Sequence, residues 1–142
     1  ILNDKSRAIV IPVNTLGIAG AGLARQWALR FPQQYQVYAT ACRDKKKPFK
    51  VGTILPVRTS EHIFLCFPTK IVPQRRSDLE WIEDGLSALK RYVSTRQIRS
   101  IAIPALGCGL GGLPWEEVKS LIESHFGKLA VRVNVYPPRR LP

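Results

Sequence analysis

The sequence predicts a three-layer α/β/α domain built on a mainly parallel, mixed β-sheet. The chain has 142 residues, of which 45% are hydrophobic, and this is enough apolar material for one buried core. Short apolar runs alternate with amphipathic helical stretches, the order that is typical of α/β folds. No internal repeat, low-complexity tract or linker divides the chain. We therefore expect residues 1–142 to form a single domain.

Strands and helices follow from hydrophobic periodicity. Strands are predicted where short apolar runs rich in β-branched residues occur, at 8–13, 53–58, 62–67, 101–103 and 131–136. Helices are predicted where good helix formers or apolar residues at spacings of three and four occur, at 23–29, 33–44, 79–93 and 115–126. The run at 8–13 is almost wholly apolar, so its strand should lie at the centre of the sheet.

The helix ends carry their own signals. Pro32 ends the first helix. Ser77 and Glu80 have the spacing of a capping box, which predicts a helix N-terminus at Ser77. Pro114 is predicted to occupy the first helical position of the last helix, because proline is favoured there.

Two glycine-rich loops, 14–22 and 105–113, each follow a predicted parallel strand. In an open α/β sheet, ligands bind outside the carboxyl ends of the strands. Glycine lets backbone N–H groups approach a phosphate closely, and the N-terminus of the following helix favours an anion. A single glycine pair more often only makes a tight turn. Four glycines within residues 107–112 instead favour one anionic ligand held between the two loops.

Several enzyme classes lack the residues that they require. Gly107, Gly109 and Gly112 spell G-x-G-x-x-G, but the strand at 131–136 has no acid to bind a ribose, which argues against an NAD enzyme. No P-loop lysine follows either loop, which argues against an NTPase. No Ser-His-Asp constellation supports hydrolysis by acyl transfer.

The cysteines and the apolar runs indicate the compartment. Cys42, Cys66 and Cys108 are scattered, and only two histidines accompany them, so we expect no metal site and no disulfide framework. Such cysteines suit a reducing cytosol, and we expect a cytoplasmic protein. No apolar run reaches 18 residues, so we expect no membrane partner.

The net charge of +12 is concentrated in the first half of the chain. Residues 1–76 hold 13 basic and 3 acidic side chains, whereas residues 77–142 hold 9 and 7. The densest basic segment is 43–50. Such density attracts a polyanion through counterion release, although a solvated, solubilising surface explains it equally well.

Both glycine-rich loops resemble those of the macrodomain family. Residues 13–24 (VNTLGIAGAGLA) are similar to the first ligand loop and helix of a macrodomain, and residues 103–113 (IPALGCGLGGL) to its phosphate loop. Residues 66–70 (CFPTK) and the stretch 77–86 are similar to the DarG branch of DNA ADP-ribosyl glycohydrolases and to the terminal ADP-ribose glycohydrolase branch. The DarG branch contains antitoxins that remove ADP-ribose from thymidine in DNA.

The resemblance implies that ADP-ribose is the ligand or product and that no cofactor is needed. The diphosphate would lie on the backbone of 107–112, and the distal ribose near Asn14 and residues 17–22. The implied ligand-binding residues are Asn14, Thr15, Gly17, Gly20, Gly22, Leu23, Pro104, Leu106, Gly107, Cys108, Gly109, Leu110, Gly111 and Gly112.

Lys70 is the residue that the resemblance implies for catalysis. The anomeric carbon C1″ of the distal ribose is an electrophile once its bond to a base loosens. A neutral amine can attack that carbon, and a charged amine can protonate the leaving group. Both roles stay open, as does the reading of Lys70 as an ordinary surface lysine.

Three departures from the family pattern bear on function. The protein-directed branch has an acid at the position of Gly111. Because this chain has glycine there, it resembles the DNA-directed branch more closely. DarG-like loops commonly have lysine where this chain has Ala21. Family members begin with a strand and a Gly-Asp pair, which would precede Ile1, so we expect the domain to lack its first strand.

The expected function is removal of ADP-ribose from thymidine in single-stranded DNA, with Lys70 as the catalytic residue. Two alternatives remain. The domain hydrolyses another ADP-ribosyl linkage, such as one to guanosine or to a protein carboxylate, or it is a reader that only binds ADP-ribose. The implied partners are ADP-ribosylated single-stranded DNA and a cognate DNA ADP-ribosyltransferase toxin, and we expect a monomer.

Overall fold

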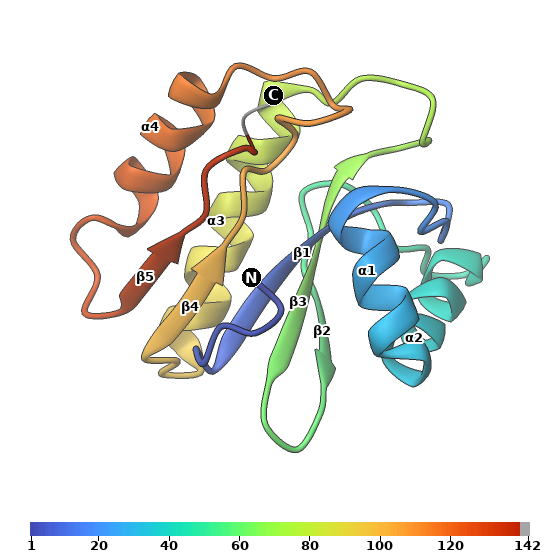
Figure 1. Cartoon of the computed structure of the whole chain (residues 1–142), viewed down its shortest axis with the longest axis horizontal. Helices are drawn as coiled ribbons and strands as arrows, with labels where there is room; N and C mark the ends of the chain where they lie inside the picture. Colours follow the sequence, from blue (N-terminus) through green and yellow to red (C-terminus); the bar gives the residue numbers. More distant parts are fainter. Residues whose placement is uncertain (140–142) are drawn as a thin grey trace.

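A computed structural model describes residues 1–139 of the chain. Its five strands are β1 (Ala8–Asn14), β2 (Leu55–Arg58), β3 (Ile63–Lys70), β4 (Ser100–Ile103) and β5 (Arg132–Val135). They form one sheet in the order β2-β3-β1-β4-β5, in which only the β2–β3 pair is antiparallel (Figure 1). The predicted mainly parallel, mixed sheet is therefore confirmed, with the strand at 8–13 at its centre.

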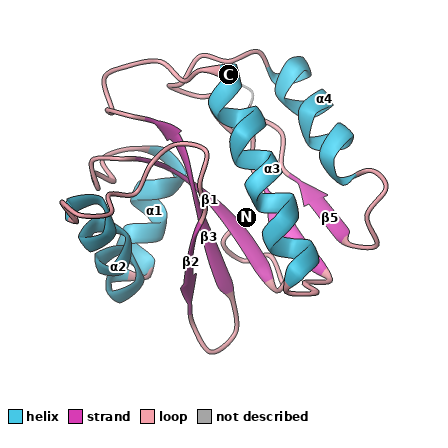
Figure 2. Ribbon diagram, turned by 180° about the vertical axis from the view of Figure 1, so that it is seen from behind, coloured by secondary structure: helices cyan, strands magenta, loops and turns pink. Residues whose placement is uncertain are grey.

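The four helices are α1 (Gly22–Arg30), α2 (Pro32–Arg43), α3 (Leu79–Thr95) and α4 (Trp115–Phe126). α1 and α2 cover one face of the sheet, and α3 and α4 cover the other (Figures 1 and 2). Because successive strand side chains point to opposite faces, Val10 packs toward α3 and α4, whereas Ile9 and Ile11 pack toward α1 and α2. This confirms the predicted three layers. Among the described residues, no helix is long and apolar enough to cross a membrane.

β3 extends three residues beyond its predicted end at 67. Its last residues still pair with β1, where Val13 lies opposite Pro68 and Asn14 lies opposite Lys70. Thr69 is therefore an extra residue on β3, and the register shifts at this point. Such a bulge re-aims the side chains that follow it. It makes Lys70 the last residue of the strand.

The capping box predicted at Ser77 and Glu80 is wrong. Asp78 is the N-cap of α3, and its Oδ1 accepts a hydrogen bond from the Glu80 N–H at 2.9 Å. The Ser77 N–H instead donates to the Gly111 carbonyl at 3.0 Å, so the helix begins later. Pro114 is also displaced from the prediction, because it is the N-cap of α4 in an extended conformation and not its first helical residue.

The segment that precedes β1 is fastened to the opposite end of the chain. Asp4 accepts hydrogen bonds from the Ser6 N–H at 2.7 Å, from Asn134 Nδ2 at 3.1 Å and from the Tyr136 hydroxyl at 2.6 Å. Leu2 is buried in the same core cluster as the side chains of α1 and α2. This segment therefore contributes to the core.

Candidate functional site

Three loops meet at the carboxyl edge of the sheet, because β3, β1 and β4 are neighbours there. The chain leaves β1 toward α1 on one face and leaves β4 toward α4 on the other face (Figure 1). A crevice forms where successive connections leave a parallel sheet on opposite faces, and it is the usual ligand site of such sheets. The structure thus brings both predicted glycine-rich loops, together with Lys70, to one edge.

Asn14 shapes the first loop from within. Its side chain is buried, and its Oδ1 accepts hydrogen bonds from the N–H groups of Leu16 at 3.1 Å, Gly17 at 3.1 Å and Ile18 at 3.2 Å. Its Nδ2 donates to the Ile18 carbonyl at 2.7 Å. The side chain that was predicted to lie near the distal ribose therefore also holds the backbone of the loop in a fixed curve.

Two tyrosines of α2 support this loop and were missed in the sequence analysis. The Tyr38 hydroxyl donates to the Asn14 carbonyl at 2.7 Å, and the Tyr35 hydroxyl donates to the Gly17 carbonyl at 2.6 Å. Burial raises the pKa of Tyr38, which keeps its hydroxyl protonated as a donor. The sequence did contain a signal for this support, because the two tyrosines are three residues apart and therefore share one face of a largely polar helix.

The first turn of α1 offers uncapped amides. Its N-cap, Ala21, makes no side-chain capping bond, and the first turn contains no acidic residue. Within residues 1–139 the N–H groups of Gly22 and Leu23 have no hydrogen-bond acceptor. Orphan N–H groups and the positive end of the helix dipole together favour a bound anion.

The second loop is folded tightly on itself. The Leu106 N–H donates to the Pro104 carbonyl at 2.9 Å, and the Leu113 N–H donates to the Gly107 carbonyl at 2.9 Å. Gly107 and Gly112 have φ values of +73° and +75°, which favour glycine. These bonds and turns leave a short stretch of backbone at the edge of the sheet, in which Gly109 and Leu110 are exposed and Gly111 is buried.

That stretch carries free donors. Within the described part of the chain, the N–H groups of Gly109, Leu110 and Gly111 have no hydrogen-bond acceptor. The Leu110 side chain is 76% exposed, so it lies beside these donors and not in the core. Burial raises the pKa of the Cys108 thiol to about 11, so it is neutral at physiological pH and adds no negative charge to the loop.

Arg76 and Ser77 hold the second loop by hydrogen bonds to its carbonyl groups. The sequence analysis missed both roles. Arg76 Nη2 donates to the Gly112 carbonyl at 3.0 Å, and the Ser77 N–H donates to the Gly111 carbonyl at 3.0 Å. A Cβ on Gly111 would lie 2.3 Å from Ser77 Oγ and 2.5 Å from the Gly107 carbonyl oxygen. A side chain at Gly111, where the resemblance implies an acid in the protein-directed branch, would therefore have to displace Ser77 or the Gly107 carbonyl.

Lys70 lies at the end of β3, beside the first loop. Its carbonyl accepts a hydrogen bond from the Thr15 N–H at 3.1 Å, which ties the end of β3 to the first loop. The Thr15 hydroxyl donates to the Ile71 carbonyl at 2.9 Å. The half-buried Lys70 side chain donates from Nζ to the Pro73 carbonyl at 3.0 Å. The loop that begins at Ile71 then reaches the second glycine-rich loop through Arg76 and Ser77.

The basic segment 43–50 begins at this edge of the sheet. Cys42, the residue before it, has its Sγ 3.9 Å from the Asn14 carbonyl. The lysines of the segment are exposed, as are Arg75 and Arg76 in the loop after β3. Within residues 1–139, no three His, Cys, Asp or Glu side chains group as a metal site would require. The site therefore combines backbone donors, one lysine and a basic rim.

Comparison with known proteins agrees with this geometry. A family model described as "Macro domain" matches residues 10–122. The DNA ADP-ribosyl glycohydrolase of Thermus aquaticus is 38% identical over 148 residues, an alignment that covers 100% of this chain and 40% of that protein. From Thermosipho africanus, a DNA ADP-ribosyl transferase-DNA ADP-ribosyl glycohydrolase fusion protein is 34% identical over 98% of this chain and 41% of that protein. The chain thus spans about two fifths of the length of these curated relatives.

Solved structures are equally similar. The macrodomain of Mycobacterium tuberculosis DarG superposes with a TM-score of 0.92 at 35% identity, covering 97% of this chain and 93% of that chain. The structure of Thermosipho africanus DarTG in complex with ADP-ribose superposes with a TM-score of 0.88 at 34% identity, covering 97% of this chain and 40% of that chain. Because the family model matches most of the chain, the chain belongs to the macrodomain family.

Proposed function

We propose that this domain is an ADP-ribosyl glycohydrolase that removes ADP-ribose from thymine bases in single-stranded DNA. The observation that carries the proposal is the position of Lys70, at the end of β3 and hydrogen-bonded to the first of two loops whose free amides suit a diphosphate. Two relatives over the whole domain are named DNA ADP-ribosyl glycohydrolases, one of them within a fusion protein. Both names support a DNA-linked substrate.

The free amides support a proposed place for each group of the ligand. The N–H groups of Gly109, Leu110 and Gly111, with the uncapped N-terminus of α1, would bind the diphosphate of ADP-ribose. The distal ribose would lie along the loop that Asn14 holds, toward Lys70. The structure of a relative in complex with ADP-ribose supports this choice of ligand.

The chemistry assigned to Lys70 breaks the bond between C1″ and the base nitrogen. In one route the neutral Nζ attacks C1″, the bonding electrons leave with the base, and water later displaces the amine. In the other route the charged Nζ protonates the departing base while water attacks C1″. A charged amine has three donors, so Lys70 can keep its bond to the Pro73 carbonyl and still donate to the base.

The proposal extends to the partners and the compartment. The exposed basic segment 43–50 supports binding of the DNA strand beside the site. The fusion of a related domain to a DNA ADP-ribosyl transferase supports a toxin of that activity as the partner. We further propose that the domain acts as a monomer in the cytoplasm without a cofactor. The three free cysteines suit that compartment.

The test is hydrolysis of an oligonucleotide that carries ADP-ribose on thymine. The wild-type domain should release ADP-ribose and restore the unmodified strand. Lys70→Ala should lower kcat at least about 100-fold, the usual contribution of an acid-base group, while ADP-ribose still binds. Lys90→Ala removes an exposed lysine of α3, away from this edge, and should leave hydrolysis unchanged.

The same assay separates the alternatives. An enzyme for thymidine should leave conjugates to guanosine and to a protein carboxylate mostly intact. ADP-ribose binding by calorimetry without turnover of any conjugate would instead identify a reader. Full activity of Lys70→Ala would remove this residue from the mechanism.

A further inference from the structure

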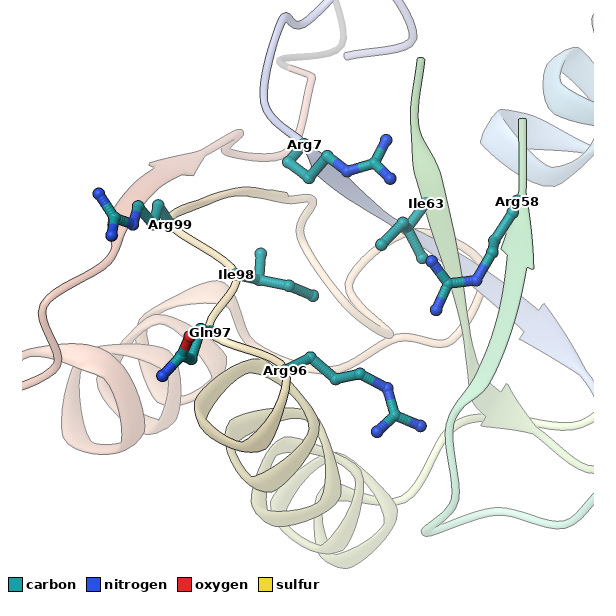
Figure 3. A pocket seen from close by; sticks show the side chains of 7 residues that line it. All are labelled: Arg7, Arg58, Ile63, Arg96, Gln97, Ile98 and Arg99. Atoms are coloured by element: carbon teal, nitrogen blue, oxygen red, sulfur yellow. The ribbon is translucent and has the colours of Figure 1, made fainter. Parts of the chain in front are cut away.

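A cluster of arginines lines a cavity at the amino edge of the sheet, opposite the glycine-rich loops (Figure 3). The cavity has a volume of about 400 Å³, and its apolar lining comes from Ile63 and Ile98. We call it the arginine pocket, and its charged lining consists of Arg7, Arg58, Arg96 and Arg99. These side chains come from the residue before β1, the end of β2 and the connection between α3 and β4.

The pocket has no counter-charge of its own. Among residues 1–139, the one basic side chain with a carboxylate oxygen within 4.0 Å is His125 of α4, beside Glu83 of α3, so no carboxylate lies that close to a pocket arginine. Arg7 Nη1 donates to the Glu61 carbonyl at 2.9 Å, and Arg58 Nη2 donates to the Tyr92 hydroxyl at 3.4 Å. Each guanidinium has five N–H donors, so most donors in the pocket have no protein acceptor.

Tyr92 places two of the guanidinium groups. Arg96 Cζ lies 4.9 Å from the centroid of the Tyr92 ring, and Arg58 reaches the hydroxyl of the same residue. Figure 3 shows the Arg58 and Arg96 side chains extending toward one another from β2 and from the end of α3. The donor fork of a guanidinium suits a phosphate, so each of these two groups can bind one.

The helix dipole explains only part of this cluster. Arg96 is the C-cap of α3, where a cation is favoured. Arg7 precedes β1 and Arg58 ends β2, and neither donates to the carbonyl of a helix end. Gln97, which also lines the pocket, has a φ of +54°, a conformation that a non-glycine residue rarely adopts. The Gln97 N–H donates to the Ser94 carbonyl at 3.3 Å and the Ile98 N–H donates to the Val93 carbonyl at 3.1 Å, so this conformation belongs to the end of α3.

We propose that the arginine pocket is a second binding site for phosphate groups and that the backbone of single-stranded DNA occupies it. The assignment to DNA rests on the proposed function, whereas the phosphate chemistry rests on the pocket alone. The seven residues of β1 separate the two edges of the sheet by about 23 Å. At the stacked rise of about 3.4 Å per nucleotide, a strand of about seven nucleotides reaches both sites.

The test measures binding of an unmodified oligothymidylate of about 20 nucleotides, by fluorescence anisotropy over a range of salt concentrations. The variant Arg58→Gln/Arg96→Gln is compared with Arg91→Gln/Lys119→Gln, which removes the same charge from exposed positions of α3 and α4. The pocket variant should bind about 10-fold more weakly than this control. Its slope of log K against log salt should be smaller by about 1.4, which corresponds to two phosphate contacts.

Three further measurements make the outcome decisive. ADP-ribose binding confirms that each variant is folded, and Arg7→Gln/Arg99→Gln should repeat the loss from the other side of the pocket. The inference is overturned if the pocket variant binds the long strand as tightly as the control. A calorimetric isotherm for inorganic tripolyphosphate that needs these arginines, while DNA binding does not, would overturn the assignment to DNA.

The two proposals fail separately. The DNA in this assay carries no ADP-ribose, so absence of hydrolysis leaves the binding result intact. Hydrolysis of ADP-ribosylated thymidine as a free nucleoside should proceed equally in the pocket variant and the wild type. For a long modified strand, the pocket variant should raise KM several-fold without changing kcat.

Discussion

Ser77 occupies the space in which a side chain at residue 111 would lie. The Ser77 N–H donates to the Gly111 carbonyl at 3.0 Å, and a Cβ on Gly111 would lie 2.3 Å from Ser77 Oγ. We therefore predict that Gly111→Ala lowers the free energy of unfolding by about 1–3 kcal/mol, the usual cost of overpacking. It should also weaken ADP-ribose binding, because the free amides of the loop must shift. Denaturant unfolding and calorimetry measure the two effects.

A matched variant exists two residues away. A Cβ on Gly109 would meet no atom within 4 Å, so Gly109→Ala should leave the free energy of unfolding almost unchanged. Adding Ser77→Gly to Gly111→Ala should restore part of the stability, because the contact with the Gly107 carbonyl at 2.5 Å remains. Equal stability of the two alanine variants would show that Ser77 does not close this position.

The second prediction concerns Asn14. Asn14→Ala removes the acceptor of three N–H groups of the first loop, and we expect it to lower the free energy of unfolding by about 2–3 kcal/mol. Asn14→Asp keeps the accepting oxygen for these N–H groups, but it sets a buried carboxylate oxygen against the Ile18 carbonyl and should also destabilise the fold. Hydrogen exchange should show faster exchange of the Gly17 and Ile18 amides in Asn14→Ala alone. Unchanged exchange there would contradict this role.

The layers of the fold were predictable from local pattern. Alternation along β1 sends Val10 to one core cluster and Ile9 to the other, and a strand covered on both faces must then be wholly apolar. The glycine-rich loops were equally predictable, because Gly107 and Gly112 adopt a left-handed backbone conformation that favours glycine. Such features depend on neighbours in the sequence.

The supports of the site depend on distant partners and were not predictable. Ser77 has the spacing of a capping box in the sequence. Its N–H instead donates to the Gly111 carbonyl, and the adjacent Asp78 caps the helix. Tyr136 meets Asp4 across 132 positions. Only the folded topology brings such residues together, so no spacing rule finds them.

The third prediction concerns the packing of Gly85 in α3 against Phe67. A Cβ on Gly85 would lie 2.3 Å from Phe67 Cζ, so the ring fits only because this helical residue has no side chain. Gly85→Ala gains about 1 kcal/mol of helix propensity but displaces a fully buried ring, and we expect a net loss of about 1–2 kcal/mol. Ser87→Ala, on the exposed side of the same helix, should be neutral or slightly stabilising. Thermal and urea unfolding would test both variants, and a stabilised Gly85→Ala would refute the packing argument.

The last prediction follows from the pKa of Asp4. Burial alone would raise this pKa, but hydrogen bonds from Ser6, Tyr136 and Asn134 outweigh it and hold the pKa well below the ordinary value of 3.8. A carboxyl whose pKa is lower in the folded state stabilises the fold above its unfolded pKa, near 3.9, and loses that contribution as the pH falls. Because the group is partly exposed, we expect Asp4→Asn to cost only about 1 kcal/mol at pH 7.

The difference in free energy of unfolding between wild type and Asp4→Asn should therefore shrink as the pH falls from about 5 to about 2. Over this range the wild type loses the contribution of the Asp4 carboxylate, which the variant lacks at every pH. Urea unfolding across this range measures it. Asp84→Asn removes the same charge from the exposed surface of α3 and corrects for the change in net charge. If the difference stayed constant across the acid range, the hydrogen bonds to Asp4 would not depend on its charge, and the fastening of the segment before β1 to β5 would have to be attributed to packing at Leu2.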